Sequence, residues 1–352
     1  MTTYLSFPPR HRPDAEHAPD TNWVLVWHIT GNPGLITYYH TYMSTLRTLL
    51  DSTEDASSHR TRFHIAGRNL LGFEDADHSP PFDATHKPYD LEAQILHIAA
   101  AVSAERIPAG PRKGQPFDAV ILSGHSVGSY IIVELFHRHQ QQSHAALRDL
   151  PLRAGVCLFP TISHLPRSDR GRAAVSLMNR FPAVADRVHL LPRALFYLWP
   201  AWLLAAFFQR AWGFTAEGAA TTARWLQSRD GAHEAAFLGM DELRTITEEK
   251  WGEELWEVTE AEAATRDQEP PPKFFFYYAQ YDHWVADEVR DEFIRVRAEH
   301  ASRDGVPAHK RGRTRTYVDE TGKLTHEFCA KEGMSEMVAE RVKTWIEEIV
   351  AN

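Results

Sequence analysis

The stretch "FDAVILSGHSVGSYIIVELF", residues 117–136, joins two different apolar patterns through the short motif "GHSVG" at 124–128. Its first seven residues are rich in β-forming side chains, which predicts a buried strand at 117–123. From 127 to 139 the apolar residues recur at helical spacing and predict a helix. Ser126 therefore stands between two glycines at a sharp turn from strand to helix.

Strands and helices alternate along most of the chain. Further predicted strands are 23–30, 62–68, 153–162, 273–281 and 313–318, and further predicted helices are 38–50, 90–107 and 335–350. This alternation predicts a mostly parallel sheet covered by helices on both faces. We expect its core in two parts, residues 21–162 and 271–352.

The composition is that of an ordinary globular protein. The 352 residues are 43% hydrophobic and 24% charged, enough for a core without disulfides or metals. A net charge of −9, with no Lys/Arg cluster that carries stacking aromatics, argues against nucleic acid as a partner. Cys157 and Cys329 form no metal or disulfide pattern, so we expect a reducing, intracellular compartment and no metal or cofactor. Residues 1–20 are polar and Pro-rich, which predicts a flexible lead-in without a secretory signal.

The motif at Ser126 has the form G-x-S-x-G, which in α/β-hydrolases makes the turn that exposes a nucleophilic serine. Gly124 and Gly128 allow strand and helix to approach closely, and His125 fills the position between the first glycine and the serine. The alternative is a tight turn with an inert serine. Because a strand precedes the motif and a helix follows it, we predict an α/β-hydrolase fold with Ser126 as nucleophile.

A nucleophilic serine needs a histidine as base and a carboxylate that orients the histidine. In this fold the chain order is serine, acid, histidine. Asp282 directly follows an aromatic strand, and His326 lies between the last predicted strand and the last helix, so we predict both for these roles. His283 is a rival for the histidine and Asp287 a rival for the acid, although Asp287 is also placed to cap the following helix. The alternative for His326 is a solvated loop histidine.

The developing negative oxygen of an ester needs two backbone N–H donors. We expect one from Val127, directly after the nucleophile. The loop "HITGNPGLITYY" at 28–39 follows the first buried strand, and Asn32 is the second expected donor. The alternative for this loop is an ordinary glycine-proline turn.

Four motifs together carry a resemblance. "GNPG" followed by a Tyr-Tyr pair, "GHSVGSY", a Tyr-rich strand leading into "DHW", and a late "HEF" resemble the lipid droplet-associated hydrolase family of α/β-hydrolases. The resemblance covers most of residues 23–350 outside one insertion, and implies Ser126 as nucleophile, Asp282 as acid and His326 as base. It further implies a serine esterase that acts on a neutral lipid ester, such as a sterol ester or acylglycerol. The implied location is the lipid droplet surface, with the endoplasmic reticulum as a second intracellular site.

Residues 163–270 break the alternation and predict a helical insertion, where hydrolases of this fold keep a lid. At its centre, "ALFYLWPAWLLAAFF" at 194–208 has no charged side chain. This stretch is shorter than the about 20 residues that span a bilayer, which favours an anchor lying in a lipid surface. The residues expected to contact lipid are Leu198, Trp199, Trp202, Leu203 and Phe207. The alternative is a lid helix packed on the core.

Two functions therefore stay open. One is an esterase or lipase with a complete triad. The other is a droplet-surface protein with a structural or regulatory role in lipid storage and weak hydrolysis. A different chemistry on the same fold, such as acyl transfer or C–C bond hydrolysis, is a third possibility, because a fold does not determine the reaction.

Overall fold

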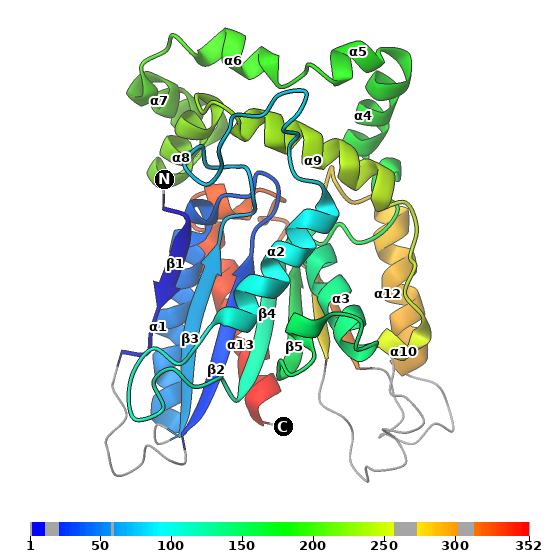
Figure 1. Ribbon diagram of the computed structural model, residues 1–352. Coiled ribbons are helices and arrows are strands. Elements are labelled where there is room, and N and C mark those ends of the chain that lie inside the picture. The colour runs from blue at the N-terminus through cyan, green and yellow to red at the C-terminus, as the bar shows by residue number, and fades with distance from the viewer. Residues whose placement is uncertain (1, 11–20, 58–59, 257–272, 302–312, 352) are drawn as a thin grey trace.

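A seven-stranded sheet lies at the centre of the computed structural model, which describes residues 2–10, 21–57, 60–256, 273–301 and 313–351 (Figure 1). The strand order is β1-β3-β2-β4-β5-β6-β7, and every neighbouring pair is parallel except β1 with β3. The strands are β1 Tyr4–Phe7, β2 Asn22–Ile29, β3 Thr61–Arg68, β4 Ala119–His125, β5 Leu152–Leu158, β6 Phe274–Tyr278 and β7 Thr314–Val318. Each strand predicted for the core falls on one of these, with ends that differ by a few residues.

Helices cover both faces of the sheet (Figure 1). They are α1 His40–Ala56, α2 Leu91–Ala104, α3 Val127–Gln140, α12 Asp287–Ala301 and α13 Met334–Ala351. The helices α1 and α13 pack on each other on one face, and α2 contacts α3 on the other. The carboxylate of Asp90 caps α2 by accepting the N–H of Ala93 at 2.8 Å, as the sequence suggests.

The prediction of a flexible lead-in over residues 1–20 is wrong for Tyr4–Phe7. These four residues form β1, which pairs antiparallel with the outer edge of β3. Leu5 and Phe7 also pack against the hydrophobic core. The backbone groups along the outer edge of β3 supply the hydrogen-bond partners of these residues, and such partners cannot be predicted from four residues alone. Residues 11–20 lie outside the described residues.

The insertion forms a cap of helices beyond the carboxyl ends of the parallel strands (Figure 1). Its helices are α4 Asp169–Arg180, α5 Pro182–Ala185, α6 Leu190–Phe196, α7 Ala201–Trp212, α8 Ala216–Leu226, α9 Gly231–Thr245 and α10 Glu253–Trp256. In Figure 1, α8 and α9 lie next to the sheet, and α5 and α6 form the outermost layer. Residues 257–270, the rest of the predicted insertion, lie outside the described residues.

Candidate active site

Ser126 occupies a strained turn between β4 and α3. Its φ of 54° and ψ of −122° are backbone angles that residues other than glycine rarely adopt. A Cβ on Gly124 would lie 2.6 Å from the carbonyl oxygen of Gly128. A Cβ on Gly128 would in turn lie 2.5 Å from the carbonyl oxygen of Ile29. Only glycine fits at these two positions, so β4, α3 and the end of β2 meet directly beside the serine.

The structure brings Ser126, His326 and Asp282 together. His326 Nε2 lies 3.0 Å from Ser126 Oγ, and His326 Nδ1 lies 2.8 Å from Asp282 Oδ2. Because a carboxylate only accepts hydrogen bonds, Nδ1 carries the proton and Nε2 is left to accept from the serine hydroxyl. The other oxygen of Asp282 accepts the N–H of Trp284 at 2.8 Å, which holds the carboxylate in place. All three side chains of the triad are buried or nearly so.

The two rival residues have other partners. Asp287, at the start of α12, is mostly exposed and pairs with Arg290 at 2.9 Å. His283 Nε2 lies 3.1 Å from Glu327 Oε1. This contact raises the pKa of His283 above its ordinary value and lowers the pKa of Glu327 to about 2. In this structure neither rival takes part in the bridge to Ser126.

The loop that contains Asn32 abuts the nucleophile. A Cβ on Gly31 would lie 3.1 Å from Ser126 Cβ and 2.9 Å from His125 Nδ1. The N–H of Gly31 donates to the hydroxyl of Tyr39 at 2.9 Å, and that hydroxyl lies 2.7 Å from His125 Nδ1. Burial holds the pKa of His125 well below its ordinary value, so its ring is neutral and Nδ1 can accept from Tyr39.

The two expected oxyanion donors are the backbone N–H groups of Asn32 and Val127. In the described part of the chain, the backbone N–H of Asn32 has no hydrogen-bond partner. Val127 is the first residue of α3, so its N–H is one of the four that lack a partner within a helix. Val127 follows Ser126 in the nucleophile elbow, the turn of residues 124–128, and Asn32 follows Gly31, which abuts Ser126, in the loop after β2. Their geometry toward a substrate oxygen remains a prediction.

Several residues around the triad were not predicted from the sequence. The Tyr-Tyr pair served only as a mark of resemblance, but the Tyr39 hydroxyl holds the N–H of Gly31, and the Tyr38 hydroxyl lies 2.8 Å from Thr222 Oγ1 on α8. The side chain of Asn32 donates to Glu242 Oε1 at 3.0 Å, a contact that also escaped prediction. The adjacent tyrosines could have predicted these contacts, because neighbouring residues of a turn can point toward two different elements. No local signal marked Glu242.

Two apolar cavities, of about 380 and 340 Å³, meet at the triad. Both are lined by Asn32, Pro33, Trp225, Trp284 and His326. The first extends toward α7, and its aromatic lining includes Phe196, Phe208, Trp212 and Phe214. The second, which Ser126 lines, extends beneath α4 and α9, and its lining includes Leu177, Met178, Val188, Met240 and Leu243. Such a pair of cavities can hold apolar groups on both sides of a reacting carbonyl.

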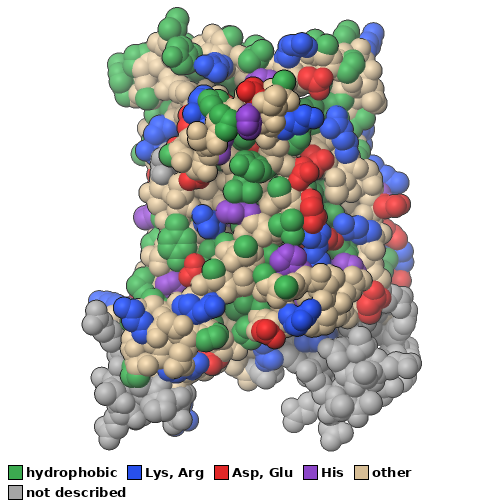
Figure 2. Space-filling model, in the orientation of Figure 1, with side chains coloured by type: hydrophobic (Ala, Val, Ile, Leu, Met, Phe, Trp, Pro, Cys, Tyr) green, Lys and Arg blue, Asp and Glu red, His purple; other side chains and the backbone are tan. Residues whose placement is uncertain are grey.

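The outer helices expose many hydrophobic side chains, which together we call the apolar platform. It consists of Phe181, Val184, Val188, Leu190, Leu191, Leu195, Tyr197, Leu198, Trp199, Trp202, Leu203, Phe207 and Trp212. Figure 2 shows hydrophobic side chains along the outer end of the cap. All five residues predicted to contact lipid belong to the platform. Among the described residues no single helix has the length and apolar character of a membrane span, and α6 with α7 reaches them only as a pair bent by 106°.

Helix α7 has a second, inner face. Leu204 and Phe208 are buried against Ala219, Ala223 and Leu226 of α8 and form a small core separate from the main one. The stretch predicted as anchor or lid therefore contains side chains of two kinds. The inner ones pack on α8, and the outer ones are exposed. Contact between the outer side chains and lipid remains a prediction.

The described residues contain no group of three or more His, Cys, Asp or Glu side chains that could hold a metal ion. Cys157 and Cys329 are free thiols. Burial raises the pKa of the Cys329 thiol to about 12, and that of Cys157 is raised further. Neither thiol is therefore suited to act as a nucleophile.

The chain is similar in sequence to named hydrolases. A family model described as lipid-droplet associated hydrolase matches residues 22–329. The lipid droplet-associated hydrolase of Mus musculus is 26% identical over 159 residues, which is 45% of this chain and 44% of the mouse protein. The human protein of that name is 26% identical over 162 residues, again 45% and 44% of the two chains. The match thus spans less than half the length of these curated relatives.

Solved structures share the fold. The wild-type protein DBJA has a TM-score of 0.53 at 12% identity, with 99% of this chain and 96% of DBJA covered. The epoxide hydrolase VrEH1 from Vigna radiata has a TM-score of 0.51 at 13% identity, with 94% and 92% covered. Together with the sheet topology, these likenesses confirm the predicted α/β-hydrolase fold.

Proposed function

Because the chain belongs to the lipid-droplet associated hydrolase family, we propose that it is a serine hydrolase that cleaves carboxylic esters of neutral lipids at a lipid droplet surface. One observation carries the proposal: His326 bridges Ser126 Oγ and Asp282 inside a buried, apolar site. The names of the relatives refer to lipid droplets and not to the endoplasmic reticulum, so the droplet is the location proposed here.

The proposed reaction follows from the triad. Ser126 Oγ attacks the ester carbonyl while His326 Nε2 takes its proton, and Asp282 stabilises the imidazolium that forms. The N–H groups of Asn32 and Val127 bind the negative oxygen of the tetrahedral intermediate. His326 then gives the proton to the departing alcohol, which leaves an acyl ester on Ser126. A water molecule, activated in the same way, releases the carboxylic acid and restores the serine.

The two cavities support an ester with apolar groups on both sides, such as a sterol ester or an acylglycerol. Each has a volume in the range typical of small-molecule sites, about 300–1,000 Å³. Aromatic and aliphatic side chains dominate their lining. An acyl chain in one cavity and the alcohol in the other would place the carbonyl beside Ser126. We propose this division of the substrate, with Trp225 and Trp284 at the junction.

The apolar platform supports a lipid surface as the place of reaction. Trp212 belongs both to the platform and to the lining of the first cavity, and Val188 belongs both to the platform and to the lining of the second. Each cavity thus reaches the exposed apolar surface at one residue. A substrate dissolved in lipid could enter either cavity there without crossing water, which favours a lipid-bound enzyme.

A structural or regulatory droplet protein is the second candidate, because the platform alone would bind lipid. A fluorophosphonate probe separates the two, since it labels only an activated serine. The wild type and Ser143→Ala, a control at an exposed serine, should label, and Ser126→Ala should not. Labelled protein should also hydrolyse emulsified sterol ester or triacylglycerol.

Two outcomes would contradict the proposal. A folded wild type that neither labels nor releases fatty acid would favour the structural role. Labelling of Ser126→Ala at the wild-type rate would show that the nucleophile is another residue. Melting temperatures of the variants, measured in parallel, show that loss of labelling is not loss of fold.

A further inference from the structure

We propose that Glu242 on α9 is a positioning residue for ester hydrolysis: it holds the side chain of Asn32, and thereby keeps the Asn32 backbone N–H beside Ser126. This inference rests on the proposed function, because it concerns the binding of the negative oxygen in that reaction. Helix α9, which also lines the second cavity, would thereby position a backbone group of the active site.

The side chain of Asn32 is held entirely by α9. Its Nδ2 donates to Glu242 Oε1 and to the carbonyl oxygen of Ala235, both at 3.0 Å. Its Oδ1 is buried and has no hydrogen-bond partner in the described part of the chain. The two hydrogens of the amide group are thus both used on one helix, and among the described residues only Glu242 forms a side-chain hydrogen bond with it.

The loop is also held from the opposite side. The N–H of Gly31 donates to Tyr39, whose hydroxyl contacts His125 of the elbow. The peptide between Gly31 and Asn32 therefore lies between two fixed points, one in the core and one in the insertion. Without the contact to Glu242, only Ala235 would hold the Asn32 side chain. The backbone N–H of Asn32 would then be free to turn away from the serine.

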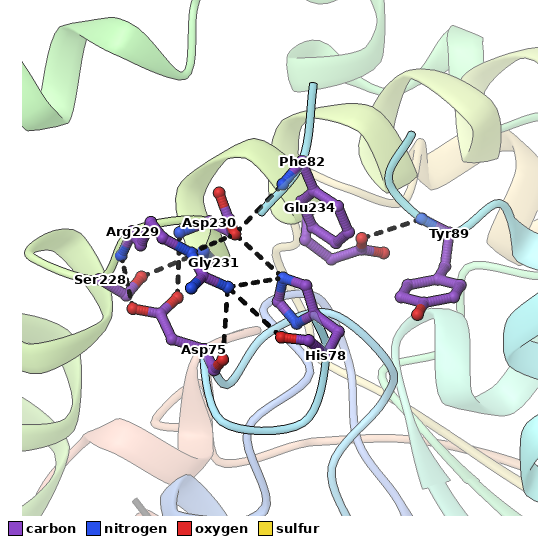
Figure 3. Close-up of polar contacts among 9 residues, drawn as sticks. All are labelled: Asp75, His78, Phe82, Tyr89, Ser228, Arg229, Asp230, Gly231 and Glu234. Carbon is purple, nitrogen blue, oxygen red and sulfur yellow. Dashed lines mark hydrogen bonds and ion pairs between the residues drawn. The ribbon is translucent and has the colours of Figure 1, made fainter. Parts of the chain in front are cut away.

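Helix α9 is a rigid support because a separate polar network ties it to the core (Figure 3). Asp75, in the loop between β3 and α2, accepts the N–H groups of Arg229 at 2.7 Å and Asp230 at 3.0 Å, directly before α9. The carboxylate of Asp230 accepts from His78 Nε2 at 3.0 Å. Figure 3 shows these side chains pointing toward one another across the junction of loop and insertion.

The first turns of α9 have a second attachment. The carboxyl group of Glu234 accepts the N–H of Tyr89 and the side-chain amide of Gln94, both at 3.0 Å. One helix position before Glu242, Asp241 accepts the N–H of Leu91 at 2.9 Å. None of these contacts involves Asn32. The attachment of α9 to the core can therefore be tested separately from its contact with Asn32.

The chemistry of Glu242 suits a place near a developing negative charge. The residue is buried and lines the second cavity, as Ser126 does. Burial raises the pKa of its carboxyl group to about 8, so the group is mostly neutral at pH 7. A neutral carboxyl accepts the Asn32 hydrogen bond without repelling the oxyanion. A glutamine, also neutral and also an acceptor, should replace it.

The test measures kcat and KM with a soluble short-chain ester, so that binding to lipid does not enter. Loss of one oxyanion donor costs about 10²–10³ in kcat. Since Glu242→Leu would loosen a donor rather than remove it, we expect kcat to fall roughly ten- to hundredfold, with KM within about twofold. Glu242→Gln should keep most of the wild-type kcat. The matched control Asp241→Leu breaks a neighbouring contact of α9, and should lower the melting temperature but keep kcat.

A double-mutant cycle decides whether Glu242 acts through Asn32. Asn32→Ala removes the amide but keeps the backbone N–H, and should lower kcat as Glu242→Leu does. The double variant should be no slower than the slower of the two single variants. The proposal would be overturned if the kcat losses of the two single variants multiplied in the double variant. It would also be overturned by a wild-type kcat in Glu242→Leu, or by a loss of kcat in Asp241→Leu equal to that in Glu242→Leu. Should Glu242→Leu not fold, a wild-type kcat in Asn32→Ala would overturn it as well.

The wild type and Ser126→Ala keep this test distinct from that of the proposed function. If the wild type turns the ester over and Ser126→Ala does not, the proposed function stands, and the variants at Glu242 and Asn32 judge the positioning role alone. If the wild type is inactive and is not labelled by the fluorophosphonate probe, the proposed function fails first.

Discussion

The apolar platform should hold the protein on a lipid surface through side chains that contribute little to its folding. Leu191, Leu198 and Trp202 are 58%, 89% and 72% exposed, so they leave most of their surface to water. Replacing all three by serine should therefore release the protein from lipid and leave the melting temperature nearly unchanged.

The size of the effect follows from the exposed fractions. Full burial of a side chain of this kind contributes about 1.5–3 kcal/mol. Scaled by exposure, the three side chains together would contribute about 3–7 kcal/mol on entering lipid. Since each 1.4 kcal/mol is about a factor of ten, the triple variant should partition onto lipid roughly 10²- to 10⁵-fold less well.

The assay is flotation with triacylglycerol emulsions coated with phospholipid, in which the bound fraction is measured against lipid concentration. Two adjacent leucines of α7 provide a matched control. Leu203 is 40% exposed and Leu204 is fully buried against α8. Leu203→Ser should weaken binding without loss of stability. Leu204→Ser should lower the melting temperature, because it leaves a cavity and buries a hydroxyl group, and should spare lipid binding of the folded fraction.

A triple variant that floats like the wild type would refute the platform as the lipid-binding surface. A triple variant that loses melting temperature by as much as Leu204→Ser would show that the outer side chains pack within the cap.

Three further predictions concern the acid, the buried glutamate and the elbow. Asp282→Asn should lower kcat by about 10⁴, the effect of the same change in a serine protease, while Asp287→Asn should keep ester turnover; the reverse result would move the acid to Asp287. Burial raises the pKa of Glu234 to about 8, so its contribution to stability is fully present below the unfolded value near 4.5 and is lost as the pH rises to about 8. Glu234→Gln should accordingly raise the melting temperature relative to wild type at pH 8.5 more than at pH 5, and an equal difference at both pH values would contradict this. Gly128→Ala should cost about 1–3 kcal/mol of stability by overpacking against the carbonyl of Ile29, seen as a lower melting temperature together with slower probe labelling, and unchanged values of both would refute the close packing of the elbow.

Local sequence patterns were sufficient to predict the core strands and the nucleophile elbow at Ser126. The glycines around Ser126 follow from a steric requirement that acts over four residues, and the strands follow from short apolar runs. The order of Ser126, Asp282 and His326 along the chain also reflects the order of strand ends in a parallel sheet. For these reasons the three residues could be named before the structure, which then places them within hydrogen-bond distance of one another.

The tertiary structure alone decided the features that depend on distant partners. Tyr4–Phe7 becomes a strand only because the edge of β3 is available, and Asn32 meets Glu242 across 210 positions of sequence. In the charge-free stretch 194–208, which ends within α7, composition cannot show which apolar residues are buried. Packing on α8 buries Leu204 and leaves Leu198 in the preceding turn exposed, because burial is a property of the neighbours a side chain meets and not of the side chain itself.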